Sequence, residues 1–286
     1  MVLDLVVEGT GDRIDRVLSG LVFGLSRRKA RDLIARGAVF VDGRRCRVVS
    51  RFVGPGSRLK VHWANALPPS TENEDLPPIL FRDDEIIVVD KPAGIHTNET
   101  ETTARRSLVS WMAEPVHLVH RLDRDTTGVI ALARSTRVAA RLSEDFKHRR
   151  VKKAYVALVE GTPTEGLIDR PIGPDRRRPR ARAVREDGKE ARTELVSVVS
   201  HGGFSEVHLC TETGRTHQIR VHLAHVGHPL LGDTLYGGPS AWRVAERSIR
   251  LGRTLLHAHR LELPGWAPFE APLPADMVEM TRSWGT

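Results

Sequence analysis

The sequence contains little cysteine and no long apolar run, and both shortages exclude classes of protein. Its 286 residues include only two cysteines, Cys46 and Cys210, too few for a disulfide scaffold or a cysteine zinc site. No apolar stretch approaches the ~18 residues that a membrane-spanning helix requires. Asp4 and Glu8 stand where a signal peptide has a basic start and an apolar stretch. We therefore expect a soluble cytoplasmic protein with reduced thiols and no membrane partner.

Acidic residues are also scarce relative to basic ones. The 36 Asp and Glu face 44 Lys and Arg, which gives a formal net charge of +8. Only seven of the basic residues are lysine, and the forked donors of arginine suit phosphate better than a lysine point charge. The balance favours nucleic acid as the partner, ahead of an acidic membrane surface. A general preference for arginine codons is the alternative explanation.

The charge is distributed unevenly along the chain. Residues 1–63 hold 13 Lys and Arg against six Asp and Glu, a net charge of +7. Residues 64–80 hold three acidic residues, no basic residue and two proline pairs, a composition that favours extended chain. We therefore predict a small basic domain over 1–63, a linker over 64–80 and a larger domain over 81–286.

The small domain has the pattern of two helices followed by strands. Apolar residues recur at helical spacing over 14–21, directly after Asp12, a candidate N-cap. Ser26 is expected to cap a second helix that ends at Gly37. An Asp-Gly hairpin signal at 42–43 follows an apolar strand, and a further short strand comes after it.

The stretch SRRKARDLIARGAVFVDG, preceded by DRIDRVLSGL, resembles the RNA-binding S4 domain. The resemblance implies that the start of the second helix grips RNA phosphates through Arg27, Arg28 and Arg31. Basic side chains at a helix N-terminus suit phosphate on electrostatic grounds. The alternative is a basic helix face that is simply solvated.

The most informative stretch is LVHRLDRDTTGVIALAR, residues 118–134. A polar loop with Asp123 and Asp125 among arginines precedes the strand VIALA, and Gly128 permits an unusual backbone turn. A carboxylate beside arginine stays ionised, which suits a nucleophile or a base. Two aspartates two residues apart could instead hold a metal or hydrogen-bond their own backbone in a turn. Spacing alone leaves these alternatives open.

HRLDRDTTG resembles the signature of the RluA family of pseudouridine synthases, which isomerise uridine in RNA to pseudouridine. The related RsuA family generally has glycine where this chain has His120. The resemblance implies that Asp123 is the catalytic aspartate and that Asp125 has a structural role in the loop. It also implies that Arg121 lies by the flipped-out base and fills the space that the base leaves.

Two further stretches match the same family. VKKAYVALVEG, residues 151–161, alternates as a strand, and the resemblance implies that Tyr155 lies against the target base and accepts its proton in the last step. Core packing is the alternative role of this tyrosine. In residues 213–237 the pattern predicts a helix that starts at Thr213 and Gly214 and ends at Gly227. The resemblance implies that Arg220 on this helix pairs with the catalytic aspartate.

The same stretch contains four closely spaced histidines, which raises the alternative of a metal site. His217 and His222 are five residues apart, off a single helical face, and no acidic ligand pattern accompanies them. Helix capping, phosphate contact and packing are the favoured roles. We expect no metal, and no cofactor either, because isomerisation needs no external group and the chain has no Gly-rich nucleotide loop.

Two loops stand apart from the family pattern. Residues 170–192 carry nine Lys and Arg against four Asp and Glu, which predicts an RNA-gripping hairpin or else a solvated loop. After the KPAG turn the chain reads IHTNETETT, where many family members have an apolar-Val-His-Pro type of loop. The contacts of this loop are therefore not carried over from the family.

We predict an α+β protein, with a small helix-strand RNA-binding domain followed by a mixed, largely antiparallel-sheet catalytic domain. Its predicted function is the isomerisation of uridines in structured RNA, ribosomal RNA first and transfer RNA second; the family is mostly monomeric. A rival hypothesis is a non-catalytic RNA-binding or ribosome-assembly factor with a synthase-like domain. Another is a hydrolase that acts on RNA or a nucleoside through the same carboxylate.

Overall fold

A computed structural model of the chain describes residues 2–8, 11–22, 25–35, 37–46, 49, 51–62, 77–98, 107–112, 114–244 and 247–282. The chain divides into two compact units. One contains Met1–Asp75 and Glu99–Arg106, and the other contains Leu76–Asn98 and Ser107–Thr286.

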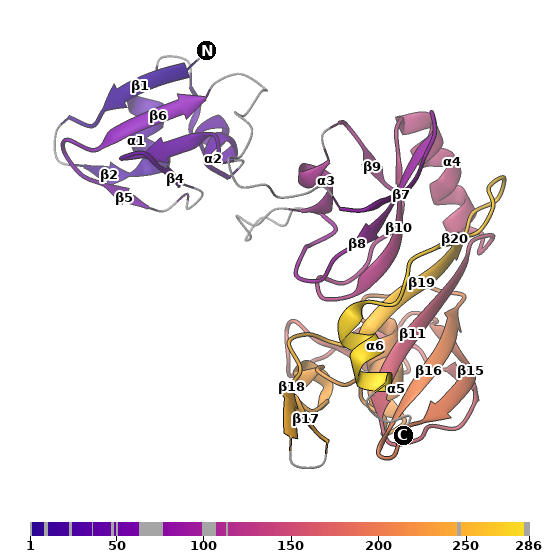
Figure 1. Cartoon of the computed structure of the whole chain (residues 1–286). Helices are drawn as coiled ribbons and strands as arrows, with labels where there is room; N and C mark the ends of the chain where they lie inside the picture. The colour runs from indigo at the N-terminus through magenta and orange to yellow at the C-terminus, as the bar shows by residue number, and fades with distance from the viewer. Residues whose placement is uncertain are drawn as a thin grey trace. The chain divides into compact units, whose positions relative to one another are not determined.

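The first unit packs two helices against a small antiparallel sheet with strand order β1-β6-β3-β4, and a short pair β2–β5 stands beside it (Figure 1). The elements are β1 (Val2–Val6), β2 (Asp12–Arg13), α1 (Ile14–Leu21), α2 (Arg27–Ala35), β3 (Val39–Val41), β4 (Arg44–Cys46), β5 (Phe52–Val53) and β6 (Arg58–His62). Fully buried Ile14, Leu18 and Ile34 join the helices to the sheet. The two predicted helices and the strands after them are present, but strands β1 and β2, which precede the helices, were not predicted.

The ends of these helices match the sequence prediction except at Asp12. Ser26 Oγ accepts a hydrogen bond from the backbone N–H of Lys29 at 3.3 Å, and Gly37 follows α2 with a φ of +73°. The Asp12 cap is wrong: Asp12 lies in β2, and Arg13 is the N-cap without a side-chain cap bond. The Asp12 carboxylate accepts instead from the N–H of Arg13 at 2.6 Å, so it is not available to the first turn.

The second unit is built on a large mixed sheet with strand order β12-β15-β16-β11-β19-β10-β8-β7, with β9 and β20 paired at its side (Figure 1). Its elements are β7 (Ile79–Arg82), β8 (Ile86–Lys91), α3 (Leu108–Trp111), β9 (His117–Leu118), β10 (Thr127–Ala133), α4 (Thr136–Lys147), β11 (Lys152–Glu160), β12 (Gly166–Asp169), β13 (Ile172–Pro174), β14 (Arg182–Val184), β15 (Arg192–Ser200), β16 (Phe204–Thr211), α5 (Gln218–His225), η1 (Thr234–Tyr236), β17 (Ala241–Val244), β18 (Arg247–Arg250), β19 (Leu256–Glu262), β20 (Phe269–Glu270) and α6 (Ala275–Arg282). The predicted α+β class and largely antiparallel sheet are confirmed.

Strand β19, near the end of the chain, lies between β10 and β11. It pairs with β11 in antiparallel fashion along most of its length. With β10 it forms the one parallel strand pair among the described strands, through the partners Thr127↔His257 and Gly128↔Ala258. Gly128 has a φ of +110°, and a Cβ there would lie 2.2 Å from the carbonyl oxygen of Ala258. Only glycine permits this close approach of the two backbones.

Helix α5 begins later than the sequence predicts. Thr213 and Gly214 belong to a turn, and the helix starts at Gln218 with His217 as its N-cap. His217 has a left-handed backbone, with a φ of 59°, which turns the chain sharply into the helix. The predicted end is confirmed, because Gly227 follows with a φ of +89°. The late start leaves an irregular turn over 212–217, and this turn forms one wall of a pocket.

Part of the predicted linker and part of the divergent loop lie outside the described residues. Of the linker 64–80, residues 64–76 are not described, and Ile79–Arg82 forms β7. Of the loop IHTNETETT, residues 95–98 are described. Among the described residues, none of the helices has both the length and the apolar character needed to cross a bilayer.

Candidate active site

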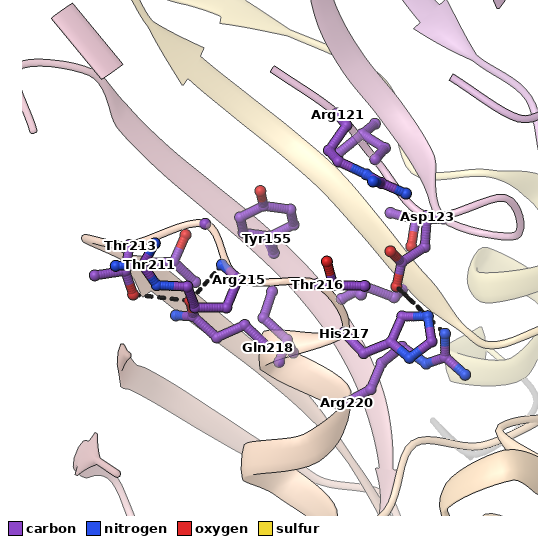
Figure 2. Close-up of a pocket in the computed structure, with 15 residues that line it drawn as sticks. Arg121, Asp123, Tyr155, Thr211, Thr213, Arg215, Thr216, His217, Gln218 and Arg220 are labelled. Atoms are coloured by element: carbon purple, nitrogen blue, oxygen red, sulfur yellow. Dashed lines mark hydrogen bonds and ion pairs between the residues drawn. The ribbon is translucent and has the colours of Figure 1, made fainter. Parts of the chain in front are cut away.

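A pocket in the second unit gathers the residues that the sequence singled out from distant parts of the chain. The loop after β9 contributes Arg121 and Asp123, β11 contributes Tyr155, and α5 contributes Arg220. The turn over 212–217 closes the remaining side (Figure 2). All four predicted residues of the catalytic domain therefore line one pocket.

A buried lysine anchors the loop that carries Asp123. The Lys91 side chain is fully buried, and its ammonium group donates to the carbonyls of Pro92, Ile95 and Arg124 at 2.9 to 3.0 Å. Burial lowers the pKa of Lys91 to about 7, although the negative charges of Asp125 and Asp123 oppose this shift. The lysine thus ties the KPAG turn to the aspartate loop.

A threonine of the divergent loop makes a second connection. Thr97 Oγ1 donates to the carbonyl of Leu122 at 2.7 Å and accepts from the N–H of the same residue at 3.1 Å. Because Leu122 directly precedes Asp123, this pair of bonds fixes the backbone at the catalytic candidate. The sequence IHT therefore supplies a loop contact of its own.

Arg220 lies between two carboxylates. Its Nη1 donates to Asp123 Oδ2 at 3.3 Å, so the predicted pairing is present. Its Nε and Nη2 donate to both oxygens of buried Asp233, at 2.7 and 2.8 Å. Burial opposes the charged form of Arg220, but the bonds and charge of Asp233, with help from Asp123, raise its pKa above the usual value. A permanent positive charge therefore faces Asp123 and stabilises its negative charge.

Tyr155 presents its ring and a protonated hydroxyl to the same pocket. Burial raises its pKa to about 12, and the nearby charge of Asp123 acts in the same direction, while a hydrogen bond with Thr211 opposes the shift. The tyrosine also packs against the apolar clusters on both sides of β19. Both roles considered for this residue, packing and proton transfer, are compatible with its position.

His120 and Arg121, adjacent in sequence, have opposite environments. The His120 Nε2 accepts from the N–H of Ala131 at 2.9 Å, and its ring stacks on Phe146. Burial lowers the pKa of His120 to about 3, with Lys153 adding to the effect. His120 is thus a neutral structural residue that joins the loop to β10. Arg121 is exposed at the pocket, with no acidic partner in the described parts of the chain.

Gln218 organises the turn before α5, a role that the sequence analysis missed. Its Oε1 accepts from the Thr213 hydroxyl at 2.8 Å and from the N–H of Arg215 at 3.0 Å. Its Nε2 donates to the Arg192 carbonyl and to Thr193 Oγ1. All of its hydrogen-bonding groups are engaged, so the turn is rigid.

The histidines that raised the metal alternative are dispersed. His222 is buried between Thr193 Oγ1 and the Arg170 carbonyl, each at 2.9 Å, and His228 bonds the carbonyl of Glu160. In the part of the chain that the structure describes, no group of His, Cys, Asp or Glu side chains has the arrangement of a metal site.

The basic stretch 170–192 contains the antiparallel hairpin β13–β14. Arg176, Arg177 and Arg180 are exposed on the connection between its strands. A hydrogen bond connects the hairpin to the site. The backbone N–H of Arg182 donates to the side-chain hydroxyl of Tyr236 at 2.8 Å. That hydroxyl also bonds His217 Nδ1 at 2.7 Å.

In the first unit, the three predicted RNA-binding arginines are not equivalent. The Nε atoms of Arg27 and Arg31 donate to Asp15 Oδ2 at 3.0 and 2.9 Å, and Arg13 donates to its other oxygen. Asp15 is buried, which by itself raises its pKa, but the three arginine bonds outweigh this and lower it to about 2. Arg28 is exposed, and we find no acidic partner for it among the described residues. The sequence did not indicate that Asp15 would hold the other two.

Comparison with known families matches both units. Residues 85–225 match the RNA pseudouridylate synthase family, and residues 12–59 match the S4 domain.

Similar proteins extend the match to nearly the whole chain. An uncharacterized RNA pseudouridine synthase of Chloroflexus aurantiacus is 38% identical over 292 residues, covering 96% of this chain and 90% of the relative. A ribosomal large subunit pseudouridine synthase D of Nitrosomonas europaea is 33% identical, covering 96% of this chain and 84% of the relative. The solved structure of human RNA pseudouridylate synthase domain containing 4 is 28% identical with a TM-score of 0.59, covering 72% of this chain and 92% of the human one.

The fold and the pocket are those of an enzyme that rearranges uridine within RNA. The chain belongs to the RNA pseudouridine synthase family, as its resemblance to the RluA signature indicated. It is an RNA pseudouridine synthase with an N-terminal S4 domain.

Proposed function

We propose that this enzyme converts uridines of large-subunit ribosomal RNA to pseudouridine, with Asp123 as the catalytic carboxylate. The observation that carries the proposal is the arrangement of Asp123, Arg220 and Tyr155 around one pocket. The choice of ribosomal RNA is supported by relatives named as large-subunit synthases from Nitrosomonas europaea and Vibrio cholerae. Transfer RNA is the competing substrate.

The chemistry begins at the ribose. Pseudouridine formation breaks the N-glycosidic bond, turns the uracil and joins its carbon 5 to the ribose, without redox change. Asp123, held next to the Arg220 guanidinium at 3.3 Å, acts as nucleophile at C1′ or as base for the 2′ proton. Both routes use the Asp123 carboxylate, and the arginine that contacts it is itself held by two bonds to Asp233.

The last step removes the proton from carbon 5 after the new bond has formed. Tyr155 lines the pocket in its hydroxyl form, because its pKa of about 12 keeps the proton on at neutral pH. It acts as a relay, receiving the proton from carbon 5 while passing its own proton onward. The Asp123 carboxylate in the same pocket is a suitable acceptor once it is free of the sugar.

The target uridine must leave its helix before any of this, at a cost of a few kcal/mol. We assign the filling of the vacated space to Arg121, which is exposed and has no acidic partner among the described residues. Arg28, Arg27 and Arg31 of the S4 domain and the exposed arginines of the β13–β14 hairpin then hold phosphates. The protein works as a cytoplasmic monomer in this proposal.

The test compares two neighbouring carboxylates of the same loop. Asp123→Asn should abolish isomerisation of a large-subunit RNA transcript and leave RNA affinity within about threefold, because it keeps the shape of the side chain. Asp125→Asn is the matched control: the Asp125 carboxylate lies beside Arg124 at 3.6 Å, outside the pocket lining, so activity should persist. Tritium release from carbon 5 measures turnover, and free uracil would reveal hydrolysis instead.

Substrate choice is tested with three transcripts in parallel. Large-subunit, small-subunit and transfer RNA are incubated with the full-length enzyme, and pseudouridines are mapped. Modification of transfer RNA alone would overturn the ribosomal assignment. An active Asp123→Asn variant would overturn the catalytic one.

A further inference from the structure

His217 has an unusual backbone that places its ring inside the active site. It is one of three non-glycine residues with a positive φ among the described residues, at 59°. Such a conformation costs of order 1 kcal/mol or more and persists where the surroundings enforce it. Here it directs the ring between the hydroxyl of Tyr236 and the carboxylate of Asp123. Figure 2 shows the ring beside Asp123 and above Arg220.

The hydrogen bonds of Tyr236 determine which nitrogen of His217 carries the proton. The Tyr236 oxygen accepts from the N–H of Arg182 at 2.8 Å. Its single hydroxyl proton then has His217 Nδ1, at 2.7 Å, as its acceptor among the described residues. If Nδ1 carried a proton, this buried hydroxyl would have nowhere to donate. The neutral ring therefore has its proton on Nε2.

Nε2 is the nitrogen that faces the catalytic carboxylate. It lies 3.9 Å from Asp123 Oδ2, the same oxygen that Arg220 contacts. A small ring or carboxylate movement brings the N–H into hydrogen-bond range of the carboxylate. We propose that His217 is a positioning residue, fixed by Tyr236 as the Nε2–H tautomer, which orients Asp123 by donating toward its Oδ2; this rests on the catalytic role proposed for Asp123.

Burial and the nearby arginines favour a neutral imidazole at His217, and they outweigh the nearby carboxylates. Burial is the largest influence and lowers the pKa of His217, and the positive charges of Arg220 on α5 and Arg182 on β14 add to it. Asp123 and Asp233 act in the opposite direction. Because the net shift is downward from 6.5, the ring is neutral at the pH at which the enzyme works.

The same bonds connect the basic hairpin to the reaction centre. Arg182 belongs to β14, so the chain of contacts runs from the hairpin main chain through the Tyr236 hydroxyl and the His217 ring to Asp123. Displacing the hairpin would remove the Arg182 N–H from the Tyr236 hydroxyl. The hydroxyl would then no longer fix the tautomer of His217. The hairpin thereby takes part in orienting Asp123 as well as in holding RNA.

The first test reads the tautomer without reference to activity. In the full-length protein with ¹⁵N-labelled histidine, two-bond ¹H–¹⁵N correlation spectra should assign His217 as the Nε2–H form. Tyr236→Phe should shift the population toward the Nδ1–H form. A wild-type Nδ1–H ring, or a tautomer unchanged by Tyr236→Phe, would overturn the inference even if the enzyme is a synthase as proposed.

The second test compares two amides that replace different ring nitrogens. The amide of His217→Gln reaches the position of Nε2 and keeps a donor toward Asp123, whereas that of His217→Asn reaches only the position of Nδ1. We expect single-turnover rates to fall about 10- to 100-fold in the Asn variant, with unchanged RNA affinity, and to be largely retained in the Gln variant. Asparagine tolerates the left-handed backbone at position 217 better than glutamine does. If backbone strain decided the rates, the Asn variant would therefore be faster than the Gln variant. Equal rates in the two variants would contradict the proposal.

Discussion

Arg220 donates two hydrogen bonds to Asp233, at 2.7 and 2.8 Å, and a longer one of 3.3 Å to Asp123. The buried Asp233 therefore fixes the guanidinium, and the third donor is presented to the pocket. In the proposed mechanism, this arrangement places a positive charge next to Asp123 and leaves the carboxylate free to engage the ribose. It predicts that Asp233, which does not react itself, contributes to the activity through Arg220.

Replacing Asp233 should therefore damage both stability and turnover. Asp233→Asn removes the charge that holds Arg220, and breaking a buried ion pair of this kind costs about 3 kcal/mol in unfolding free energy. We expect single-turnover rates to fall at least tenfold. Glu85→Gln is the control, because the Arg141–Glu85 pair is exposed and is expected to contribute less than about 1 kcal/mol. A stable, fully active Asp233→Asn enzyme would disprove the assignment; urea unfolding and tritium release provide the measurements.

Tyr155→Phe should separate the first steps of the reaction from the last. The ring stays and fills the same space, so RNA affinity is expected within about threefold of wild type. Loss of the hydroxyl should stop proton removal from carbon 5, and tritium release from 5-tritiated uridine should then disappear while glycosidic bond cleavage still occurs. If tritium is released at the wild-type rate, Tyr155 is a packing residue only.

Gly128→Ala should be among the most damaging single substitutions in the second unit. Its φ of +110° is unfavourable for alanine, and the added Cβ would lie 2.2 Å from the Ala258 carbonyl oxygen. Strain and overpacking together predict a loss of about 3 kcal/mol or more, visible in a thermal unfolding curve. Gly252→Ala, where the added Cβ meets no atom within 4 Å, should leave the midpoint nearly unchanged. Similar midpoints for the two variants would count against the backbone argument.

Because Lys91 is buried, we expect the free energy of unfolding to rise with pH. Its pKa is about 7 in the folded protein and near 10.5 when unfolded, because burial disfavours the ammonium form. Between these values the unfolded chain binds more protons, so the unfolding free energy rises with pH, by up to about 1.4 kcal/mol per unit. The difference between wild type and Lys91→Met, measured by urea unfolding at pH 6.5, 8 and 9.5, isolates this residue from other groups. A difference that stays constant with pH would show that Lys91 is charged throughout.

The S4 arginines should differ in their effects on RNA binding and on stability. Arg28 lacks an acidic partner among the described residues, so Arg28→Ala should lower RNA affinity without changing stability. The slope of log affinity against log salt concentration should also become shallower by about one. Arg31 bonds Asp15, so Arg31→Ala should also destabilise the unit by roughly 1 kcal/mol. Affinity at several salt concentrations and urea unfolding of both variants distinguish the two. If the two variants bound RNA and unfolded identically, the bond between Asp15 and Arg31 would contribute nothing to stability.

Sequence patterns succeeded where the determining interactions are local. The Asp42-Gly43 turn, the Ser26 cap and the end of α5 at Gly227 depend on a few adjacent residues and are found as predicted. Asp12 failed as a cap because its carboxylate bonds the next backbone N–H and the helix starts one residue later.

The candidate site residues were predicted through family resemblance, but the residues that support them were not predicted. Lys91 bonds carbonyls as far as Arg124, and Gln218 bonds two residues of β15, contacts that only the folded sheet creates. Asp233 lies 13 residues beyond Arg220, across a turn, so no helical or strand period relates them. The late start of α5 accompanies the left-handed backbone of His217, whose ring bonds Tyr236, 19 residues further along the chain.

The position of β19 has a consequence for when the enzyme becomes active during its synthesis. Asp123 reaches the site from the β10 side of this strand, whereas Tyr155 and Arg220 lie on the β11 side. β19 joins the two halves, yet its residues, Leu256–Glu262, come after Asp123, Tyr155 and Arg220 in the chain. A nascent chain that already carries these three proposed catalytic residues still lacks the strand that brings them together. The pocket therefore assembles only after β19 has been synthesised, well after these three residues of its lining.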